Sequence, residues 1–321
     1  MFHILPFTVH AQFVLKQNCL KKIMTAVFVE EGPDKGAVWH FGEPNREQRA
    51  LEEEKAWADL SHHEIVTVSG LDRLTWLHSL TTQYLENLAV GQWVDVLILD
   101  PQGHIEHQFL LVDDGKTSWL VVDPGRAESL INHLSRMKFM MRVEINDVSK
   151  DFAFIKIPGL TDDRGGPYQI VPRSELARLI AEFNEGTIQV GTWALDAERV
   201  AKRRPRIGFE MDFKSIPNEL GLLNTAVHMN KGCYRGQETV AKIANLGKPP
   251  RRLVLLHLDG SVVTIPSVGS AVEKDGVKVG FIGTTARHFE LGTIALAVIK
   301  RNTPEDATLV VEGIPASQEI T

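Results

Sequence analysis

The most informative stretch of the sequence is Lys231-Gly232-Cys233-Tyr234-Arg235-Gly236-Gln237-Glu238-Thr239-Val240-Ala241-Lys242. Two glycines bracket the cysteine, and glycine adopts the positive φ angles of a tight turn at little cost. From Gly236 onward the residues follow a short helical pattern, with Glu238 in its first turn and Gly247 as its stop, as the helix dipole and the glycine C-cap favour. The stretch therefore predicts a loop that presents a thiol at the start of a short helix.

Cys233 has two cationic neighbours in the sequence, Lys231 and Arg235. Cationic side chains and a helix N-terminus both favour the thiolate form of a cysteine. The alternative is a buried cysteine that only packs, which is what most free cysteines do. We expect an accessible and reactive thiol at this position.

The run Lys-Gly-Cys-Tyr-x-Gly-Gln-Glu, residues 231–238, resembles the signature of the YgfZ family. Members of this family are folate-binding relatives of the glycine-cleavage T-protein that act in iron–sulfur cluster assembly. The resemblance implies an α+β fold of two intertwined ferredoxin-like domains followed by a small C-terminal β-barrel. It also implies tetrahydrofolate, or a close folate derivative, as the cofactor.

The resemblance assigns the chemistry to Cys233 and Lys231. Arg251 and Arg252 are expected to clamp a carboxylate of the cofactor where the barrel begins, because guanidinium matches the geometry of a carboxylate. The full set of residues that the resemblance implies for cofactor binding is Arg199, Tyr234, Arg235, Gln237, Glu238, Arg251 and Arg252.

Two departures separate the sequence from the T-proteins themselves. T-proteins carry an Arg-x-Glu run whose glutamate contacts the pterin ring, and Ala201 stands at that place after Arg199. They also carry an aspartate pair after a Gly-Gly-Ile turn, where this chain has Glu106 and His107. Both differences favour the YgfZ branch over an aminomethyltransferase.

Composition and charge limit the class of protein. With 321 residues, 43% hydrophobic and 24% charged, the chain should form two or three globular domains. The net charge of -6 argues against a general nucleic-acid scaffold, so we expect no direct DNA binding. The two cysteines, Cys19 and Cys233, allow no disulfide framework and no four-thiolate cluster, which indicates a reducing, cytoplasmic setting.

The first 23 residues are apolar and contain no acid, and we expect them to lie outside the fold, with Met24 as a natural start. Their lysines follow the apolar run, whereas a signal peptide needs positive charge before it. No apolar stretch approaches 18 residues, so we expect no membrane span. The chain divides into an extension at 1–46, a ferredoxin-like folate-binding domain at 47–150, a second α/β domain at 151–248 with the cysteine motif, and a barrel at 249–321.

The pattern of the domain at 47–150 has the sense β-α-β-β-α-β of a ferredoxin-like layer. Asn45 and Gln48 resemble a capping box for a helix whose charged run, 47–54, is a solvated face and whose apolar side includes Trp57 and Leu60. Strands are predicted at 64–69, 94–99, 105–112, 118–122 and 142–148, and helices at 70–82 and from Asp123 to Met137.

The remainder of the chain contains a second α/β unit and a run of short strands. Strands at 152–157 and 168–171, helices at 174–184 and 192–203, and a loop at 205–218 are predicted first. Strands at 253–258, 271–273, 277–282, 293–298 and 308–311 follow without a helix, as in a small closed barrel.

Three further clusters have competing interpretations. His104 and Glu106 share a face of a strand, but two ligands do not make a metal site, and His62-His63 are better interpreted as surface histidines, so no metal is predicted. The basic run 202–206 suits RNA, the glutamate tail of folate or a solvated loop.

The sequence thus favours a tetrahydrofolate-binding protein that assembles, maintains or repairs iron–sulfur proteins, with an indirect effect on tRNA modification. Its partners would be folate and iron–sulfur client or assembly proteins. The alternative is a folate-dependent one-carbon transferase, and a third interpretation, an RNA-binding accessory protein, is disfavoured by the acidic net charge. Whether the protein is an enzyme is left open.

Overall fold

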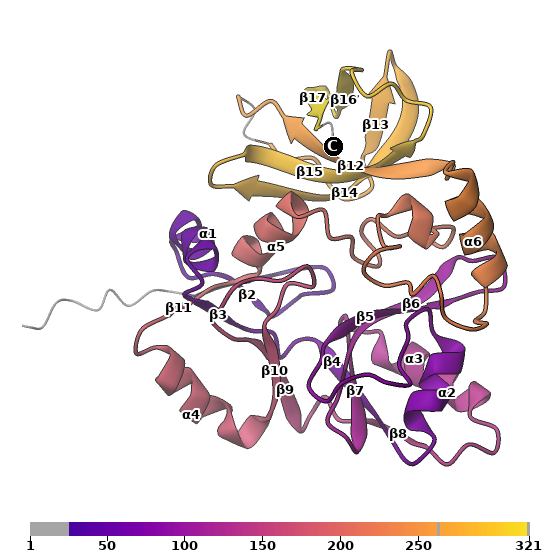
Figure 1. The fold of residues 1–321 in the computed structure, drawn as a ribbon. Helices are drawn as coiled ribbons and strands as arrows, with labels where there is room; N and C mark the ends of the chain where they lie inside the picture. The colour runs from indigo at the N-terminus through magenta and orange to yellow at the C-terminus, as the bar shows by residue number, and fades with distance from the viewer. Residues whose placement is uncertain (1–25, 262–263, 320–321) are drawn as a thin grey trace, which may run out of the picture.

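The structure, a computed structural model, describes residues 26–261 and 264–319. These residues form two mixed layers of strands and helices beneath a closed barrel (Figure 1). The architecture is α+β, as the sequence predicts. The expected extension up to Ile23 lies outside the described residues. No helix in the described ranges is long and apolar enough to cross a membrane.

The first layer is a five-stranded antiparallel sheet in the order β5-β6-β7-β4-β8, with two helices packed on one face. The strands are β4 (Glu64–Ser69), β5 (Val94–Leu99), β6 (Ile105–Asp113), β7 (Thr117–Val122) and β8 (Glu144–Asp147), and the helices are α2 (Arg73–Leu80) and α3 (Ala127–Met137). Along β5, Val94, Val96 and Ile98 pack against the helices, while Leu97 and Leu99 contribute to a different core. This alternation gives the sheet one face toward the helices and one toward the rest of the molecule.

The helix α3 begins later than predicted. Asp123 does not cap it, because Arg126 is the N-cap residue and the Asp123 carboxylate instead pairs with Arg206 at 3.0 Å. The turn Asp123-Pro124-Gly125 therefore aims the aspartate at a distant segment rather than at the helix.

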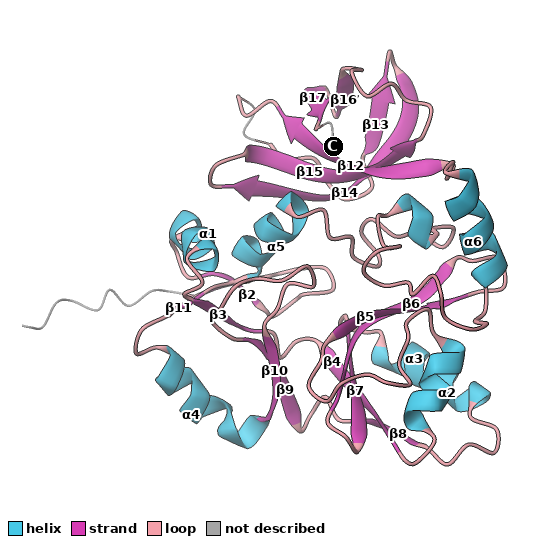
Figure 2. Ribbon diagram, viewed as in Figure 1, coloured by secondary structure: helices cyan, strands magenta, loops and turns pink. Residues whose placement is uncertain are grey.

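The second layer is a four-stranded sheet in the order β10-β9-β3-β11, with α4 (Arg173–Phe183) covering one face (Figure 2). Its strands are β3 (Ala56–Asp59), β9 (Phe152–Lys156), β10 (Tyr168–Pro172) and β11 (Ile188–Gln189). Because β3 precedes the first sheet in the chain and β9 follows it, the two layers are interleaved. The expected division at residue 150 therefore does not separate the sheets, since α1 and β3 pack with the second layer.

The predicted helix at the start of the fold is shorter than expected. Helix α1 covers Pro44–Glu52, and Trp57 lies in strand β3, where it is fully buried. The predicted capping box is wrong, since the N-cap is Glu43 and no side chain caps the helix. Leu60, which was placed on the same helix, follows β3 and is also buried.

The charged run of α1 is not wholly solvated, because Glu47 is completely buried. Its carboxylate accepts hydrogen bonds from the backbone N–H groups of Phe41 at 2.7 Å and Gly191 at 2.9 Å. Gly191 is the N-cap of α5 (Thr192–Ala201), where a negative charge is favoured by the helix dipole. Glu47 thus joins the N-terminal segment to the start of α5.

Residues 26–43, expected to lie partly outside the fold, contain a small hairpin. Its strands, β1 (Val27–Phe28) and β2 (Val38–His40), were not predicted from the sequence. The loop between them carries Asp34, whose carboxylate forms two hydrogen bonds of 2.6 Å with the guanidinium of Arg206. This hairpin is therefore anchored to the centre of the molecule.

The barrel has the strand order β12-β15-β14-β13-β16-β17. Its strands are β12 (Arg251–Leu258), β13 (Ala271–Lys274), β14 (Val277–His288), β15 (Gly292–Lys300), β16 (Leu309–Val311) and β17 (Ile314–Gln318). Only β17 was not predicted. Helix α5 packs beneath the barrel, with Ala197 and Val200 against Leu255 and Ile294.

The cysteine motif lies between the short 3-10 helix η1 (Pro217–Glu219) and α6 (Gln237–Leu246). Gly236 and Gly247 bound α6 with φ angles of 79° and 62°, as predicted. A Cβ atom at Gly236 would lie 2.6 Å from the carbonyl oxygen of Asp100, so this glycine allows the motif to pack on the turn between β5 and β6.

Candidate functional site: a central cavity

A cavity of about 860 Å³ lies where the two sheets and the barrel meet. Its volume is within the range of about 300–1,000 Å³ that is usual for sites that hold a small organic ligand. Its walls come from β5, β6 and β7 of the first sheet, β9 and β10 of the second, α5 with the segment that follows it, residues 218–225, and the start of β12. No single element of the described chain makes this site.

One side of the cavity is apolar and aromatic. Leu110 from β6 lies with Phe154 and Tyr168 from the second sheet. The rings of Phe154 and Tyr168 have centroids 4.7 Å apart and are tilted by 38°. Burial raises the pKa of Tyr168 above its usual range, so its phenol remains protonated. A flat, uncharged ring system would find van der Waals contact here.

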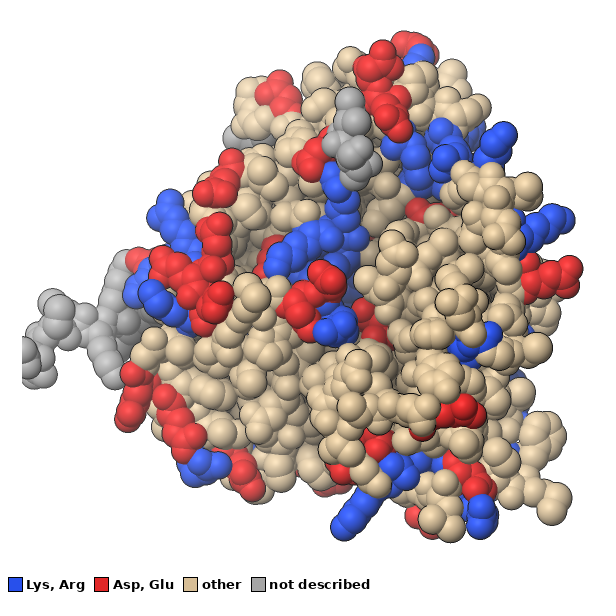
Figure 3. Space-filling view, viewed as in Figure 1, with Lys and Arg blue, Asp and Glu red and all other residues tan. Residues whose placement is uncertain are grey.

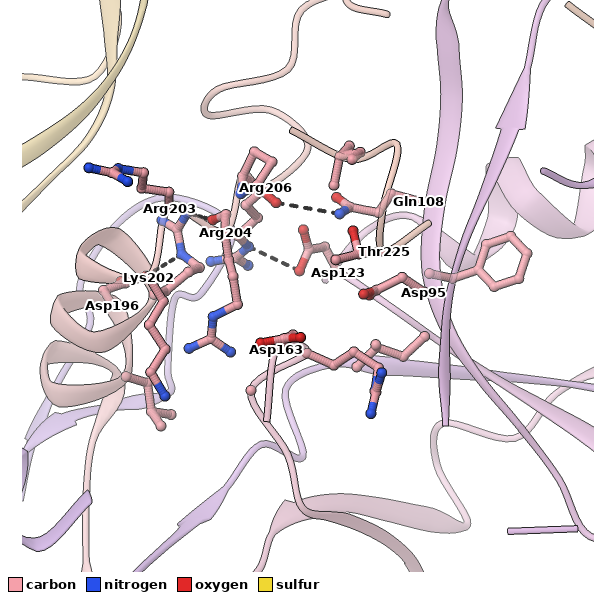
Figure 4. Close-up of a pocket in the computed structure, with 18 of the residues that line it drawn as sticks. Asp95, Gln108, Asp123, Asp163, Asp196, Lys202, Arg203, Arg204, Arg206 and Thr225 are labelled. Carbon is pink, nitrogen blue, oxygen red and sulfur yellow. Dashed lines mark hydrogen bonds and ion pairs between the residues drawn. The ribbon is translucent and has the colours of Figure 1, made fainter. Parts of the chain in front are cut away.

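A polar wall lies beside this aromatic surface. Asp95, Gln108 and Thr225 line it, and Figure 4 shows Asp95 and Thr225 across the cavity from Lys202 and Arg204. Burial raises the pKa of Asp95 to about 6. Gln108 is fixed by the segment that follows α5, since its Oε1 accepts from the N–H of Ile207 at 3.2 Å.

The opposite wall is basic. Lys202, Arg203 and Arg204 line it, and Figure 3 shows Lys and Arg side chains gathered beneath the barrel in the middle of this face. Arg204 pairs with Glu198 at 3.1 Å, and Arg203 pairs with Glu319 at 2.6 Å. The basic run is therefore neither a free loop nor a simple patch, because each of these charges is held at the edge of the cavity.

A second ionic cluster closes the end of the cavity nearest the N-terminal hairpin. Arg206 joins Asp34 and Asp123 there, and His62 lies 3.4 Å from Asp34. Burial, with the neighbouring His62 charge, lowers the pKa of His63 to about 4. The interpretation of His62 and His63 as surface histidines is wrong, since both line the cavity with most of their side-chain surface covered.

Of the predicted cofactor-binding residues, Arg199 and Arg252 line the cavity. The guanidinium of Arg199 is already occupied, because it donates to Asp196, Glu210, Thr284 and the carbonyl oxygen of Arg204. Arg252 donates to Gln318 at 2.6 Å, while its Nε–H has no acceptor in the described part of the chain. Arg252 is thus the better placed of the two for a ligand.

Arg251 does not form the predicted clamp with Arg252. It is absent from the described lining residues, and its guanidinium pairs with Asp212 at 2.7 Å and Glu219 at 2.8 Å. Side chains alternate along a strand, so neighbours at the start of β12 point in opposite directions. The two arginines therefore serve different surfaces.

The cysteine motif forms a separate region. Cys233 is exposed, as the sequence predicts, and lies outside the set of described residues that line the cavity. Of the neighbouring cofactor-binding candidates, Tyr234 is buried in the core, Arg235 pairs with Glu106 at 3.2 Å, and Glu238 is exposed. None of these three candidates, nor Gln237, is among the cavity residues in the described ranges.

Lys231 does not lie beside the thiol with a free charge, because its ammonium group is buried. It donates to the backbone carbonyl oxygens of Thr81 at 2.6 Å and Gln83 at 3.1 Å, and also to that of His78. Burial lowers the pKa of Lys231 to about 8. Gln237 closes the turn by donating to the carbonyl oxygen of Lys231 at 3.3 Å. Lys231 therefore fixes the position of the loop that carries Cys233.

The turn in which T-proteins have an aspartate pair is also rearranged. His104 bonds to Asp100 at 2.8 Å, and Glu106 faces Arg235 and His133. Within the described segment 103–108, Gln108 is the residue that lines the cavity. In the described ranges, no three His, Cys, Asp or Glu side chains are grouped to hold a metal ion.

Asp95 and Thr225 were not predicted from the sequence, although one signal was available. Asp95 is the charged residue within the apolar strand Val94–Leu99, where burial disfavours a carboxylate. That mismatch between residue and position could have marked it as functional.

Comparisons with known proteins point in the same direction as the fold. The family described as the GCVT N-terminal domain matches residues 21–160. A chloroplastic protein of Arabidopsis thaliana whose name places it among the transferases is 27% identical over 81% of this chain and 69% of that protein. The tRNA-modifying protein YgfZ of Aliivibrio fischeri is 31% identical, over 40% of this chain and 41% of its own length.

A third relative is the mitochondrial iron–sulfur cluster assembly factor IBA57 homologue of Phaeosphaeria nodorum, 24% identical over 65% of this chain and 57% of that protein. Among solved structures, the glycine cleavage system aminomethyltransferase T of Bartonella henselae superposes with a TM-score of 0.75. The match covers 93% of this chain and 94% of that one at 16% identity, so it shows the fold alone.

Proposed function

Because the chain belongs to the T-protein-like family of YgfZ and IBA57 proteins, we propose that it binds a reduced folate in the central cavity and acts in the assembly, maintenance or repair of iron–sulfur proteins. An effect on tRNA modification would follow indirectly, through iron–sulfur enzymes that modify tRNA. The relatives named YgfZ and IBA57 homologue support this reading by their descriptions.

The observation that carries folate binding is the division of the cavity into three chemically different walls. A reduced folate has a hydrogen-bonding pteridine ring, an aromatic aminobenzoyl group and a glutamate tail with two carboxylates. Asp95 and Gln108 offer hydrogen-bonding groups, Phe154 and Tyr168 offer an aromatic surface, and the basic wall with Arg252 offers charge to carboxylates. The cavity thus has a counterpart for each part of the ligand.

We assign the proposed iron–sulfur role to Cys233. The thiol is exposed on a loop whose base is fixed by Lys231, outside the cavity. A client protein can reach an exposed thiol without displacing a bound folate. We propose that Cys233 acts on, or protects, the cluster of a client while the folate occupies the cavity.

A folate-dependent one-carbon transferase is the second candidate, and a specific observation favours it. A carboxyl group, Asp95, faces the cavity even though the expected aspartate pair is replaced, and several relatives are named as transferases, among them aminomethyltransferases. Such a group could exchange a proton with a ring nitrogen of the folate. Release of a one-carbon unit over several turnovers, measured by mass spectrometry of folates incubated with an amine donor, would move this candidate to first place.

Isothermal titration of the full chain with tetrahydrofolate tests the proposal. We expect saturable binding with one site per chain and a competing effect of other reduced folates. The variant Phe154→Ala, which removes part of the aromatic surface, should weaken binding. A wild-type protein that shows no heat of binding up to millimolar folate would refute this reading of the cavity.

A further inference from the structure

We propose that Asp95 is the residue that recognises the pteridine ring, with its carboxylate accepting hydrogen bonds from the 2-amino group and the adjacent N3–H. This inference deepens the proposed function and rests on it. It assigns the orientation of the ligand, with the ring against β5 and β6 and the glutamate tail toward the basic wall formed by residues 202–204.

Asp95 differs from the other carboxylates of the cavity in its lack of a partner. Among the described residues, no hydrogen bond and no ion pair within 4 Å reaches its side chain, whereas the other buried carboxylates of the cavity are paired with arginines. The pairs are Asp34 and Asp123 with Arg206, Asp196 with Arg199, Glu198 with Arg204, and Glu219 with Arg251. Asp163, which also lines the cavity, is exposed.

The backbone of β5 holds Asp95 in a fixed position. Asp95 is paired with Leu110 across the sheet, and its carbonyl oxygen accepts from the Gln83 side chain at 3.2 Å. Because side chains alternate, Asp95 shares a face with Leu97 and Leu99, which are buried in the core between the first sheet and the barrel. A carboxylate therefore occupies a position where its neighbours on the same face are apolar.

An unpaired carboxylate in such a place costs stability, because it loses hydration without gaining a hydrogen bond. Groups of this kind persist where a ligand supplies the missing partner. The ligand group must offer hydrogen-bond donors, since an ionised carboxylate only accepts. Two parallel N–H donors on one edge of a ring match the two oxygens of a carboxylate, as a guanidinium does.

The neighbouring surfaces fit a ring rather than a flexible cation. Leu110, paired with Asp95 in the sheet, and the tilted rings of Phe154 and Tyr168 line the same cavity. A flat pteridine can contact these side chains while its donor edge meets Asp95. The remaining length of the folate then extends toward Lys202 and Arg204, which lie across the cavity in Figure 4.

The ionisation of Asp95 gives the proposal a pH dependence. Burial raises its pKa to about 6, and the ligand's donors favour the ionised form, so binding below pH 6 requires loss of a proton. Affinity should be constant above about pH 7 and fall about tenfold per pH unit well below 6. Five other charged or titratable groups interact electrostatically with Asp95. Asp162, Asp163 and Arg164 lie in the loop 161–167, Arg204 lies in the segment after α5, and Tyr168 lies in β10.

The test compares Asp95→Asn with the wild-type protein, using tetrahydrofolate and an analogue that lacks the 2-amino group. Loss of the amino group should weaken wild-type binding by about 10- to 100-fold, as expected for a charge-assisted hydrogen bond. Asp95→Asn should bind tetrahydrofolate more weakly by a similar factor, discriminate little between the two ligands, and lose the pH dependence below 6. Asp163→Asn, the same change at an exposed carboxyl of the cavity, should keep the wild-type affinity for tetrahydrofolate at pH 7 and the wild-type discrimination between the two ligands.

The outcomes separate the inference from the function on which it rests. If Asp95→Asn binds tetrahydrofolate as tightly as the wild type, the role of Asp95 is overturned and folate binding stands. The same holds if the variant still discriminates between the two ligands by the full factor. Absence of any folate binding by the wild type would overturn both. Circular dichroism of Asp95→Asn guards against misfolding, and equal weakening by Asp163→Asn would show that cavity charge, and not Asp95, is responsible.

Discussion

Two ionisable groups, Lys231 and Asp95, show how burial can have different consequences. The ammonium of Lys231 is enclosed by backbone carbonyl oxygens, whereas the carboxylate of Asp95 faces an open cavity with no bonded partner in the described chain. Burial moves both pKa values toward the neutral form, that of Lys231 to about 8 and that of Asp95 to about 6. The first group organises a loop, and the second is available to a ligand.

Asp95→Asn should stabilise the free protein near neutral pH. A pKa raised above the unfolded value means that ionisation opposes folding, so this destabilisation is absent at pH 3, develops as pH rises from about 4 to about 6, and is complete above that. The gain at pH 7 should be on the order of 2–3 kcal/mol. Urea denaturation of wild type and variant at pH 4 and pH 7 measures it, and an equal difference at both pH values would contradict the prediction.

The two arginines at the start of β12 should have separable effects. Arg252→Ala should weaken folate binding by roughly 1.5–3 kcal/mol if its guanidinium holds a carboxylate of the ligand. Arg251→Ala should instead lower stability with little effect on affinity, because it leaves Asp212 and the buried Glu219 without their partner. Titration and thermal melting of both variants decide this, and a larger affinity loss in Arg251→Ala would restore the clamp that the sequence suggested.

Cys233→Ser should leave the fold and the folate affinity unchanged, because the thiol is exposed and outside the described cavity lining. If Cys233 acts on client clusters, the variant should fail to restore iron–sulfur enzyme activity in cells that lack the gene. Iodoacetamide should also modify the native wild-type protein. Full restoration by Cys233→Ser would reduce the thiol to a surface residue without a role in the function.

At the scale of elements, strong local patterns were predicted well and elements defined by distant partners were not. The run Val94–Leu99 was assigned correctly because its length and apolar character are typical of a buried strand. The strand Ala56–Asp59 was assigned to a helix, because its pairing partners lie far away in the sequence, at 155–156 and at 188–189. The five residues of β17 contain a proline and polar residues, which do not predict a strand without the barrel around them.

The candidate site was predictable only in part for the same reason. The motif at 231–238 identified the family and the exposed thiol, since a signature is local. The cavity is built from Asp34, Asp95, Phe154, Arg204 and Arg252, which are far apart in the sequence. Which of two neighbouring arginines faces it depends on the register of one strand.

The junction between the cysteine loop and the β5–β6 turn offers a test at this scale. Gly236→Ala would place a methyl group 2.6 Å from the carbonyl oxygen of Asp100, at a φ of 79° that alanine disfavours. We expect a loss of stability of at least 1–2 kcal/mol and faster proteolysis of the loop. Gly232→Ala, where an added Cβ meets no heavy atom within 4 Å, is the matched control. Equal behaviour of the two variants would show that the loop does not depend on this contact.

At the scale of the whole molecule, the N-terminal hairpin contributes to the cavity together with the sheets. Asp34 reaches Arg206 from the loop of that hairpin, and Arg206 also holds Asp123. The hairpin thus links residue 34 to segments at 123 and 206, and positions one end of the cavity.

Two truncations separate the hairpin from the residues before it. Removal of residues 1–23 should change the melting temperature little, because the anchoring contacts of Asp34 and Glu47 are retained. Removal of residues 1–36 should lower it by several degrees, since the buried charge of Arg206 loses two of its hydrogen bonds. Thermal melting of both proteins distinguishes the cases, and a large drop in the shorter deletion would show that the first residues are docked.

The interleaving of the two sheets bears on how the protein emerges from the ribosome. Strand β3 ends at Asp59, but its neighbour β9 begins at Phe152, so the second sheet cannot start to close until those later residues have been synthesised. At about 5–20 residues per second, the delay is roughly 5 to 20 s. During that time the strands of the first sheet, β4 to β8, are themselves being synthesised, and Ala56–Asp59 stays unpaired. Nascent chains of this length are the ones we would expect a chaperone to bind.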